Sequence, residues 1–103
     1  MDDLLRRFLP QFVTLARTRI ETAITAAKKR DAESVKTTVR ELHTLVGEAG
    51  LLGLAQVVPL ARECEHKAKH LHVSQPEAEV VALVDALREL NQMIETIGGA
   101  TTQ

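Results

Sequence analysis

The stretch HTLVGEAGLLG, residues 43–53, holds one histidine and three glycines inside a segment that otherwise favours a helix. A neutral imidazole is a nucleophile at neutral pH. Gly47 follows His43 by one helical turn, although a glycine inside a helix costs about 1 kcal/mol relative to alanine. Its missing side chain opens the ring to a partner surface, and Lys36 and Arg40 could offset the charge of a phosphoryl group. This arrangement favours phosphoryl transfer through His43.

These residues share one face of a helix that Asp31 is expected to cap. The apolar stripe of this helix comprises Val35, Val39, Leu42, Val46 and Ala49. At about 100° per residue, His43 lies about 80° from the centre of that stripe, at the border between core and solvent. The outer sector beside His43 holds Lys36, Arg40, Thr44, Gly47 and Leu51. We interpret this sector as phosphate-assisting or partner-docking, with a solvated face as the alternative for the cations and a core position as the alternative for Leu51.

The other two glycines have simpler interpretations. For Gly50, close helix packing and access to the histidine are equal alternatives. Gly53 lies where a C-terminal helix cap is expected.

Helical periodicity predicts one short helix and four long ones. The first two expected helices are 1–9, capped by Asp2 or Asp3, and 11–29. The third extends from Asp31 to Gly53, and the fourth from Leu54 or Ala55 to about Leu71. The fifth begins at a capping box of Ser74 and Glu77, with Pro76 in its first turn, and ends at Gly98 and Gly99. Short loops imply antiparallel neighbours. The sequence therefore predicts an all-α, antiparallel up-down four-helix bundle with a short additional N-terminal helix, as a single domain over 1–103 with a flexible tail at 98–103.

The composition argues against several classes of protein. The chain has 103 residues and a net charge of −1, with no block of basic residues for nucleic acid or an anionic membrane. Its single cysteine, Cys64, excludes an internal disulfide framework. There is no signal-peptide pattern, and no apolar run approaches the roughly 18 residues of a membrane span. We expect a cytoplasmic protein, and its small size and polar outer faces favour a monomer.

The residues around His43 resemble the signature of histidine-containing phosphotransfer (Hpt) domains. That signature reads His-x-Leu-Lys-Gly-x-Ala, followed after two more residues by Leu and Gly. This chain supplies His43, Leu45, Gly47, Ala49, Leu52 and Gly53. The resemblance also covers LLRRFLPQFV, AAKKRDAESV and LARECEHKA, and so extends over nearly the full length.

The resemblance implies a phosphoacceptor role for His43 in a multistep two-component phosphorelay. The histidine would take a phosphoryl group from the aspartyl phosphate of one receiver domain and pass it to the aspartate of another. Partners would be response regulator receiver domains and a hybrid sensor kinase. Such a domain has no kinase or phosphatase activity of its own, and it needs no cofactor, because the Mg²⁺ is expected on the partner receiver domain.

One signature position departs from the family pattern. The family usually has a lysine near the phosphoryl group three residues after the histidine, and this chain has Val46. Lys36 and Arg40 are the candidates to substitute for it, and Glu48 is expected to point away from His43. A non-catalytic Hpt-like adaptor that binds or sequesters a receiver domain therefore stays open, as does a helical bundle unrelated to signalling.

A second cluster of potential ligands occurs in CEHKAKHLH. His66 and His70 have the i, i+4 spacing that can place two imidazoles on one metal ion, with Cys64 and His72 close by in sequence. The intervening lysines and the lack of a third ligand in register favour a solvated face. We expect no metal site, and we interpret Cys64 as a core residue.

Overall fold

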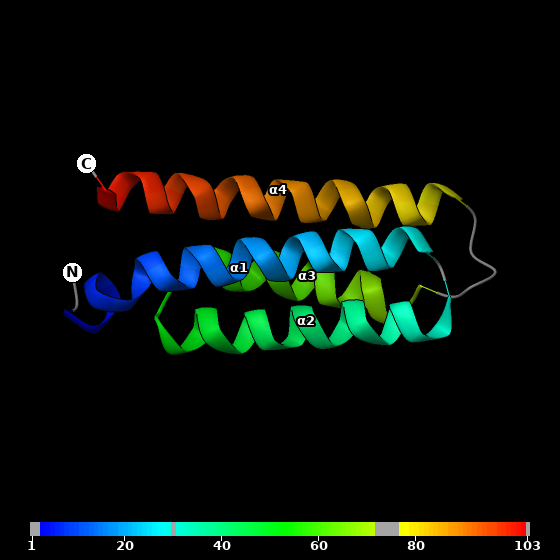
Figure 1. Ribbon diagram of the computed structural model, residues 1–103, viewed down its shortest axis with the longest axis horizontal. Helices are drawn as coiled ribbons and strands as arrows, with labels where there is room; N and C mark the ends of the chain where they lie inside the picture. The colour runs from blue at the N-terminus through cyan, green and yellow to red at the C-terminus, as the bar shows by residue number, and fades with distance from the viewer. Residues whose placement is uncertain (1–2, 30, 72–76, 103) are drawn as a thin grey trace.

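The computed structural model describes residues 3–29, 31–71 and 77–102. These ranges hold four helices: α1 (Asp3–Lys29), α2 (Ala32–Leu51), α3 (Val57–Lys69) and α4 (Glu77–Thr102). Successive helices run in opposite directions, so both chain ends lie at one end of the bundle (Figure 1). Each helix packs against two neighbours, in the cyclic order α1, α2, α3, α4. The predicted all-α four-helix bundle is confirmed. No described helix is long and apolar enough to cross a membrane.

The predicted additional N-terminal helix is wrong, because its described residues form the first turns of α1. An apolar stripe continues across Pro10, through Leu5 and Leu9 before it and Phe12 after it. The proline removes one backbone hydrogen bond, to the carbonyl of Arg6. Pro10 is exposed, so water can reach that carbonyl. Burial of the stripe outweighs the lost bond. The expected caps Asp2 and Asp3 differ in outcome: Asp2 lies outside the described residues, and Asp3 begins the helix.

Small and aliphatic side chains fill the core along the bundle axis. From α1 and α2 come Leu9, Phe12, Ala16, Ile20, Ala23, Ala27, Leu42, Leu45 and Ala49. From α3, its preceding turn and α4 come Leu54, Val57, Ala61, Cys64, Ala68, Val80, Leu83, Leu87, Leu90 and Ile94. Each large aliphatic side chain in this set contributes about 1.5–3 kcal/mol through burial. The assignment of Cys64 to the core is confirmed.

The buried face of α2 differs from the predicted one. Thr38, Leu42, Leu45 and Ala49 are buried, whereas the three valines of the predicted stripe are only half-buried. The reason is that α2 packs against α1 on one side and α3 on the other. Thr38 is accommodated because its Oγ1 donates to the Ser34 carbonyl oxygen at 2.9 Å and also contacts that of Ala23 in α1. The buried face is thus rotated about the helix axis relative to the predicted stripe. This rotation places His43 further toward solvent than the predicted border position.

Both predicted ends of α2 are confirmed. The Ser34 backbone N–H donates to Asp31 Oδ1 at 2.8 Å, and this hydrogen bond lowers the pKa of the Asp31 carboxyl. Gly53 has φ +70, and Leu54 N–H donates to the Ala49 carbonyl oxygen at 3.0 Å, which closes a Schellman motif. This capped turn delays the start of α3, so that α3 begins at Val57 rather than at Leu54 or Ala55.

The predicted end of the last helix is wrong, since α4 continues past Gly98 to Thr102. Gly98 serves packing, because a Cβ there would lie 3.1 Å from the methyl groups of Val13 in α1. The close approach of α1 and α4 therefore explains this glycine. Ser74 and Pro76 of the predicted start signal lie outside the described residues, as does Gln103. The flexibility of residues 98–103 stays a prediction.

Candidate functional site

His43 lies near the middle of α2 with its ring on the outside of the bundle. Its side chain is 77% exposed. Nδ1 of the ring lies 2.8 Å from Glu65 Oε2 on α3, and this contact orients the ring. This contact crosses from one helix to the next and joins residues 22 positions apart. With Nδ1 engaged and most of the ring exposed, Nε2 is the nitrogen that a partner can reach.

Glu65 is a buried acidic residue, with only 10% of its side chain exposed. The same oxygen that contacts His43 also lies 3.5 Å from Lys69 Nζ, one turn further along α3. A buried carboxylate needs such partners, because an isolated charge is costly in a protein interior. Neither Glu65 nor Lys69 is among the site residues predicted from the sequence. A signal was present, since Glu65 falls on the buried stripe of α3 beside Ala61, Cys64 and Ala68.

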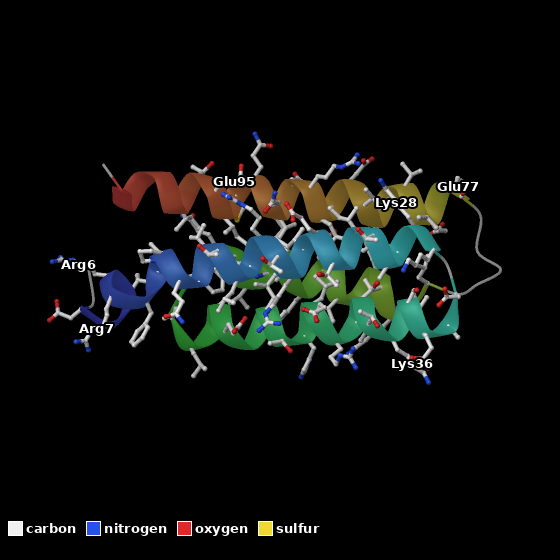
Figure 2. The ribbon with its side chains drawn as sticks, viewed as in Figure 1. Arg6, Arg7, Lys28, Lys36, Glu77 and Glu95 are labelled. Atoms are coloured by element: carbon white, nitrogen blue, oxygen red, sulfur yellow. The ribbon has the colours of Figure 1, made fainter. Side chains whose placement is uncertain are left out.

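A shallow surface groove surrounds His43 between α2 and α3. It is lined by Val35, Lys36, Val39, Arg40, His43, Glu65 and Lys69. The structure thus places the predicted cations Lys36 and Arg40 in one groove with the histidine. Lys36 extends outward from α2 (Figure 2). The groove gives the histidine a positively charged border, which suits an anionic group.

Gly47 and Gly50 leave open space on the exposed face of α2. Beyond adjacent residues and the helix backbone, no described atom lies within 4 Å of where a Cβ would stand at either position. Packing within this chain therefore explains neither glycine. For Gly47 the other explanation is access to the ring of His43, which is the interpretation predicted from the sequence. At Gly50 the same observation removes the packing interpretation.

Leu51 and Thr44 lie outside the groove that contains His43. Leu51 is 83% exposed at the end of α2, so the alternative of a core position is wrong for it. It borders an apolar groove with Phe8 and Leu15, two exposed side chains of α1. We call these three residues the apolar patch. Thr44 is half-buried on α2.

Glu48 points away from His43, as predicted, and is tied to α1. Arg19 Nε donates to Glu48 Oε1 at 2.9 Å, and Arg19 Nη1 donates to Glu41 Oε2 at 3.1 Å. The hydrogen bond to Glu48 is the largest factor that raises the pKa of Arg19, followed by opposing desolvation and then by the bond to Glu41. This network fixes α2 against α1 and so holds the outward face of α2 in place.

The second histidine cluster has a different geometry. His66 and His70 are exposed, their ring centroids are 4.3 Å apart, and Nδ1 of His70 lies 2.8 Å from the His66 carbonyl oxygen. Cys64 is buried in the core, and His72 lies outside the described residues. Among the described residues, no three potential ligands gather in a way that could hold a metal ion.

Comparison with known protein families identifies a match over most of the chain. The family model of the Hpt domain matches residues 7–100, a range that includes most of α1 and α4 and all of α2 and α3. Searches among curated proteins and among solved structures found no match.

Proposed function

We propose, since this chain belongs to the Hpt domain family, that it shuttles phosphoryl groups between receiver-domain aspartates through His43. Hpt domains carry out histidine phosphotransfer in phosphorelays and generally interact with receiver domains and hybrid kinases. The proposal assigns the phosphoacceptor role to His43 and the partner-docking surface to the outward face of α2. In this proposal the chain acts in the cytoplasm as a monomer, without kinase or phosphatase activity of its own.

The observation that carries the proposal is the exposed ring of His43 beside an open glycine position. A phosphoryl donor must approach a ring nitrogen in line, with the reacting atoms about 3–3.5 Å apart. The 77% exposure of the His43 side chain and the empty space at Gly47 both permit that approach. The exposed cations Lys36 and Arg40 border the same groove and would offset the charge of the phosphoryl group.

The partner that this face suits is a receiver domain bearing an aspartyl phosphate. In the forward reaction, a nitrogen of His43 forms a bond to phosphorus, and the bond from phosphorus to the aspartate oxygen breaks. The aspartate leaves as a carboxylate with the bonding electron pair. The Mg²⁺ that such a transfer uses belongs to the receiver domain in this proposal, and Thr44 and Gly47 would lie under the docked partner.

The apolar patch supports docking on the same side of the bundle. Leu51 belongs to the same helix as His43, two turns beyond it, and Phe8 and Leu15 extend the patch onto α1. Apolar contact at the patch would supply affinity, while the cations at the groove would orient the phosphoryl group. We assign the patch to receiver docking because it continues the surface that carries the histidine.

The test is transfer of labelled phosphoryl from a phosphorylated receiver domain to the wild-type chain and to His43→Gln. We expect acid-labile, base-stable label on the wild type and none on the variant. Receiver binding without any label would favour the non-catalytic adaptor. Neither label nor binding across a panel of receivers would leave a helical bundle unrelated to signalling.

A further inference from the structure

We infer, on the basis of the proposed function, that Arg19 and Glu48 determine which receiver side chain the apolar patch accepts. With Arg19 paired to Glu48, the patch accepts an apolar side chain. Without Arg19, the carboxylate of Glu48 favours a cationic one. Neither residue lines the groove that contains His43, so the pair acts on the choice of partner and not on the phosphoryl chemistry.

The apolar patch borders a groove between α1 and α2. From α1 the groove is lined by Phe8, Gln11, Phe12 and Leu15, and from α2 and its C-cap by Glu48, Leu51 and Leu52. Phe8, Leu15 and Leu51 are exposed large hydrophobic side chains. Exposed apolar surface that gathers in this way marks a contact with another protein. The occupant that the groove suits is an apolar side chain of the docked receiver.

Glu48 is the one ionisable side chain among the described residues that line this groove. Its side chain is 30% exposed, so a docked receiver would remove water from the carboxylate. A carboxylate that loses water without gaining a partner is strongly unfavourable. By itself, Glu48 would therefore oppose an apolar side chain in the groove and favour a lysine or an arginine.

Arg19 offsets the charge of Glu48 from outside the groove. Its Nε donates to Glu48 Oε1 at 2.9 Å and its Nη2 donates to Glu48 Oε2 at 3.3 Å, so both carboxylate oxygens are engaged. Such a bidentate pair fixes the orientation of the carboxylate as well as offsetting its charge. The second carboxylate on Arg19, that of Glu41, accepts from Nη1 at 3.1 Å and also lies outside the groove. The wall that faces a docked receiver is thus a neutral ion pair.

This arrangement makes Arg19 a determinant of receiver specificity. A receiver that presents an apolar side chain meets a paired carboxylate and keeps its hydrophobic contact. A receiver that presents a lysine or an arginine must compete with Arg19 for Glu48 or leave its own charge unpaired. Rejection of the second kind of receiver by an unpaired charge is how interfaces commonly discriminate between partners.

The variants that test the pair are Arg19→Met and the double variant Arg19→Met, Glu48→Met. The probe is a receiver domain that labels the wild-type chain, and isothermal titration calorimetry measures its binding. We expect Arg19→Met to weaken binding about tenfold, because it leaves a carboxylate unpaired at the interface. The double variant should bind within about twofold of the wild type, because the charge is removed together with its partner. Labelling at saturating receiver should be unchanged in both.

The double variant separates the role of charge from that of helix packing. If Arg19 only fixes α1 against α2, the double variant also lacks the pair and binds as weakly as Arg19→Met, which would overturn the inference. Thermal unfolding followed by circular dichroism checks that each variant is folded.

The chain offers a matched control on the same helix. Arg17 on α1 pairs with Glu95 on α4 at 3.4 Å, and neither residue lines the groove beside Leu51. Arg17→Met removes the same charge from α1 and should leave receiver binding unchanged. Equal weakening by Arg17→Met and Arg19→Met would assign the effect to the total charge of α1 and overturn the inference.

The choice of side chain is tested by changing the receiver. Alanine scanning of its exposed apolar residues identifies the one whose contribution to binding is lost in Leu51→Ala. With lysine at that receiver position, Arg19→Met should bind about tenfold more tightly than the wild-type chain does. Equal binding by the two chains, or no receiver residue coupled to Leu51, would overturn the inference.

Failure of this inference is distinguishable from failure of the proposed function. Labelling of the wild type together with unchanged receiver binding in Arg19→Met would overturn the inference and leave the proposed function intact. Absence of label on the wild type would refute the proposed function itself.

Discussion

Two exposed histidine sites on this bundle differ in what holds the ring. His43 on α2 is anchored by the buried carboxylate of Glu65, which belongs to a different helix. His70, the C-cap residue that follows α3, contacts the carbonyl oxygen of His66 in the last turn of that helix, and the two rings lie 4.3 Å apart. Side-chain exposure is therefore not what separates them. The tertiary contact at His43 fixes which nitrogen faces solvent, whereas the local contact at His70 comes with helix geometry.

The comparison shows how a reactive side chain can be both exposed and oriented. A carboxylate in the interior has few alternative positions, so the ring that it holds has few as well. A backbone carbonyl within the same helix is available to many side chains. The buried partner of His43 therefore supports the proposal that His43 is the phosphoacceptor.

The largest expected effect tests which of the exposed histidines takes up the phosphoryl group. The double variant His66→Gln, His70→Gln should take up phosphoryl label at the wild-type rate, whereas His43→Gln should take up none. The physical reason is that the exposed ring of His43 is oriented by Glu65 and lies beside open space at Gly47. The measurement is the stoichiometry of label after incubation with a phosphorylated receiver. Label that persists in His43→Gln and disappears in the double variant would reverse the comparison.

A smaller effect is expected when the open space beside the ring is filled. Gly47→Leu should slow transfer about 10- to 100-fold, because a displaced donor no longer aligns with the nitrogen. Gly47→Ala should raise the free energy of unfolding by up to about 1 kcal/mol, since the added Cβ meets no described atom and alanine favours the helix. Transfer kinetics and urea unfolding measure the two effects separately.

Gly50→Ala is the matched control for the stability effect, because its Cβ position is equally open. Both alanine variants should gain similar stability. Wild-type transfer rates in Gly47→Leu would show that the missing side chain does not serve access to His43.

The apolar patch should contribute to affinity rather than to chemistry. Leu51→Ala should weaken receiver binding about tenfold, equivalent to about 1.4 kcal/mol, as expected for an exposed apolar residue at the centre of an interface. Val81→Ala on α4 is the control, because Val81 is also an exposed aliphatic side chain, at 49%. Isothermal titration calorimetry measures both. Equal weakening by the two variants would place docking away from the patch.

Much of this fold could be predicted from local signals in the sequence. Periodicity predicts the four long helices, and the caps at Asp31 and Gly53 lie where short-range chemistry puts them. Long-range packing explains the failures. The stripe on both sides of Pro10 extends α1 through a residue that usually ends a helix. At Gly98, the close approach of α4 to Val13 in α1 explains a glycine inside the helix.

The residues of the candidate site also fall into two groups, those that local spacing predicts and those that depend on packing between helices. His43, Gly47 and Leu51 could be identified because spacing along one helix reveals a shared face. Glu65 and Lys69 could not be assigned to the histidine, because their contact depends on how α3 lies against α2. A glutamate on the buried stripe of α3 was the only sign in the sequence, and its partner is not deducible from α3 alone.

The smallest expected effect concerns Cys64, which directly precedes Glu65 on α3 and is fully buried. Burial raises the pKa of the Cys64 thiol to about 12, from an ordinary value of 9.0. Above pH 9.0 the unfolded chain loses this proton while the folded chain retains it, so stability should fall as the pH rises toward about 12. The slope from this one group is at most about 1.4 kcal/mol per pH unit.

Cys64→Ala should change the absolute stability and remove that part of its pH dependence. Urea unfolding of the wild type and the variant, below and above pH 9.0, measures the difference in slope. The same pH dependence in both proteins would mean that the thiol ionises in the folded state at its ordinary value. Solvent would then reach this part of α3, and Glu65 would no longer be the constrained partner that distinguishes His43 from His70.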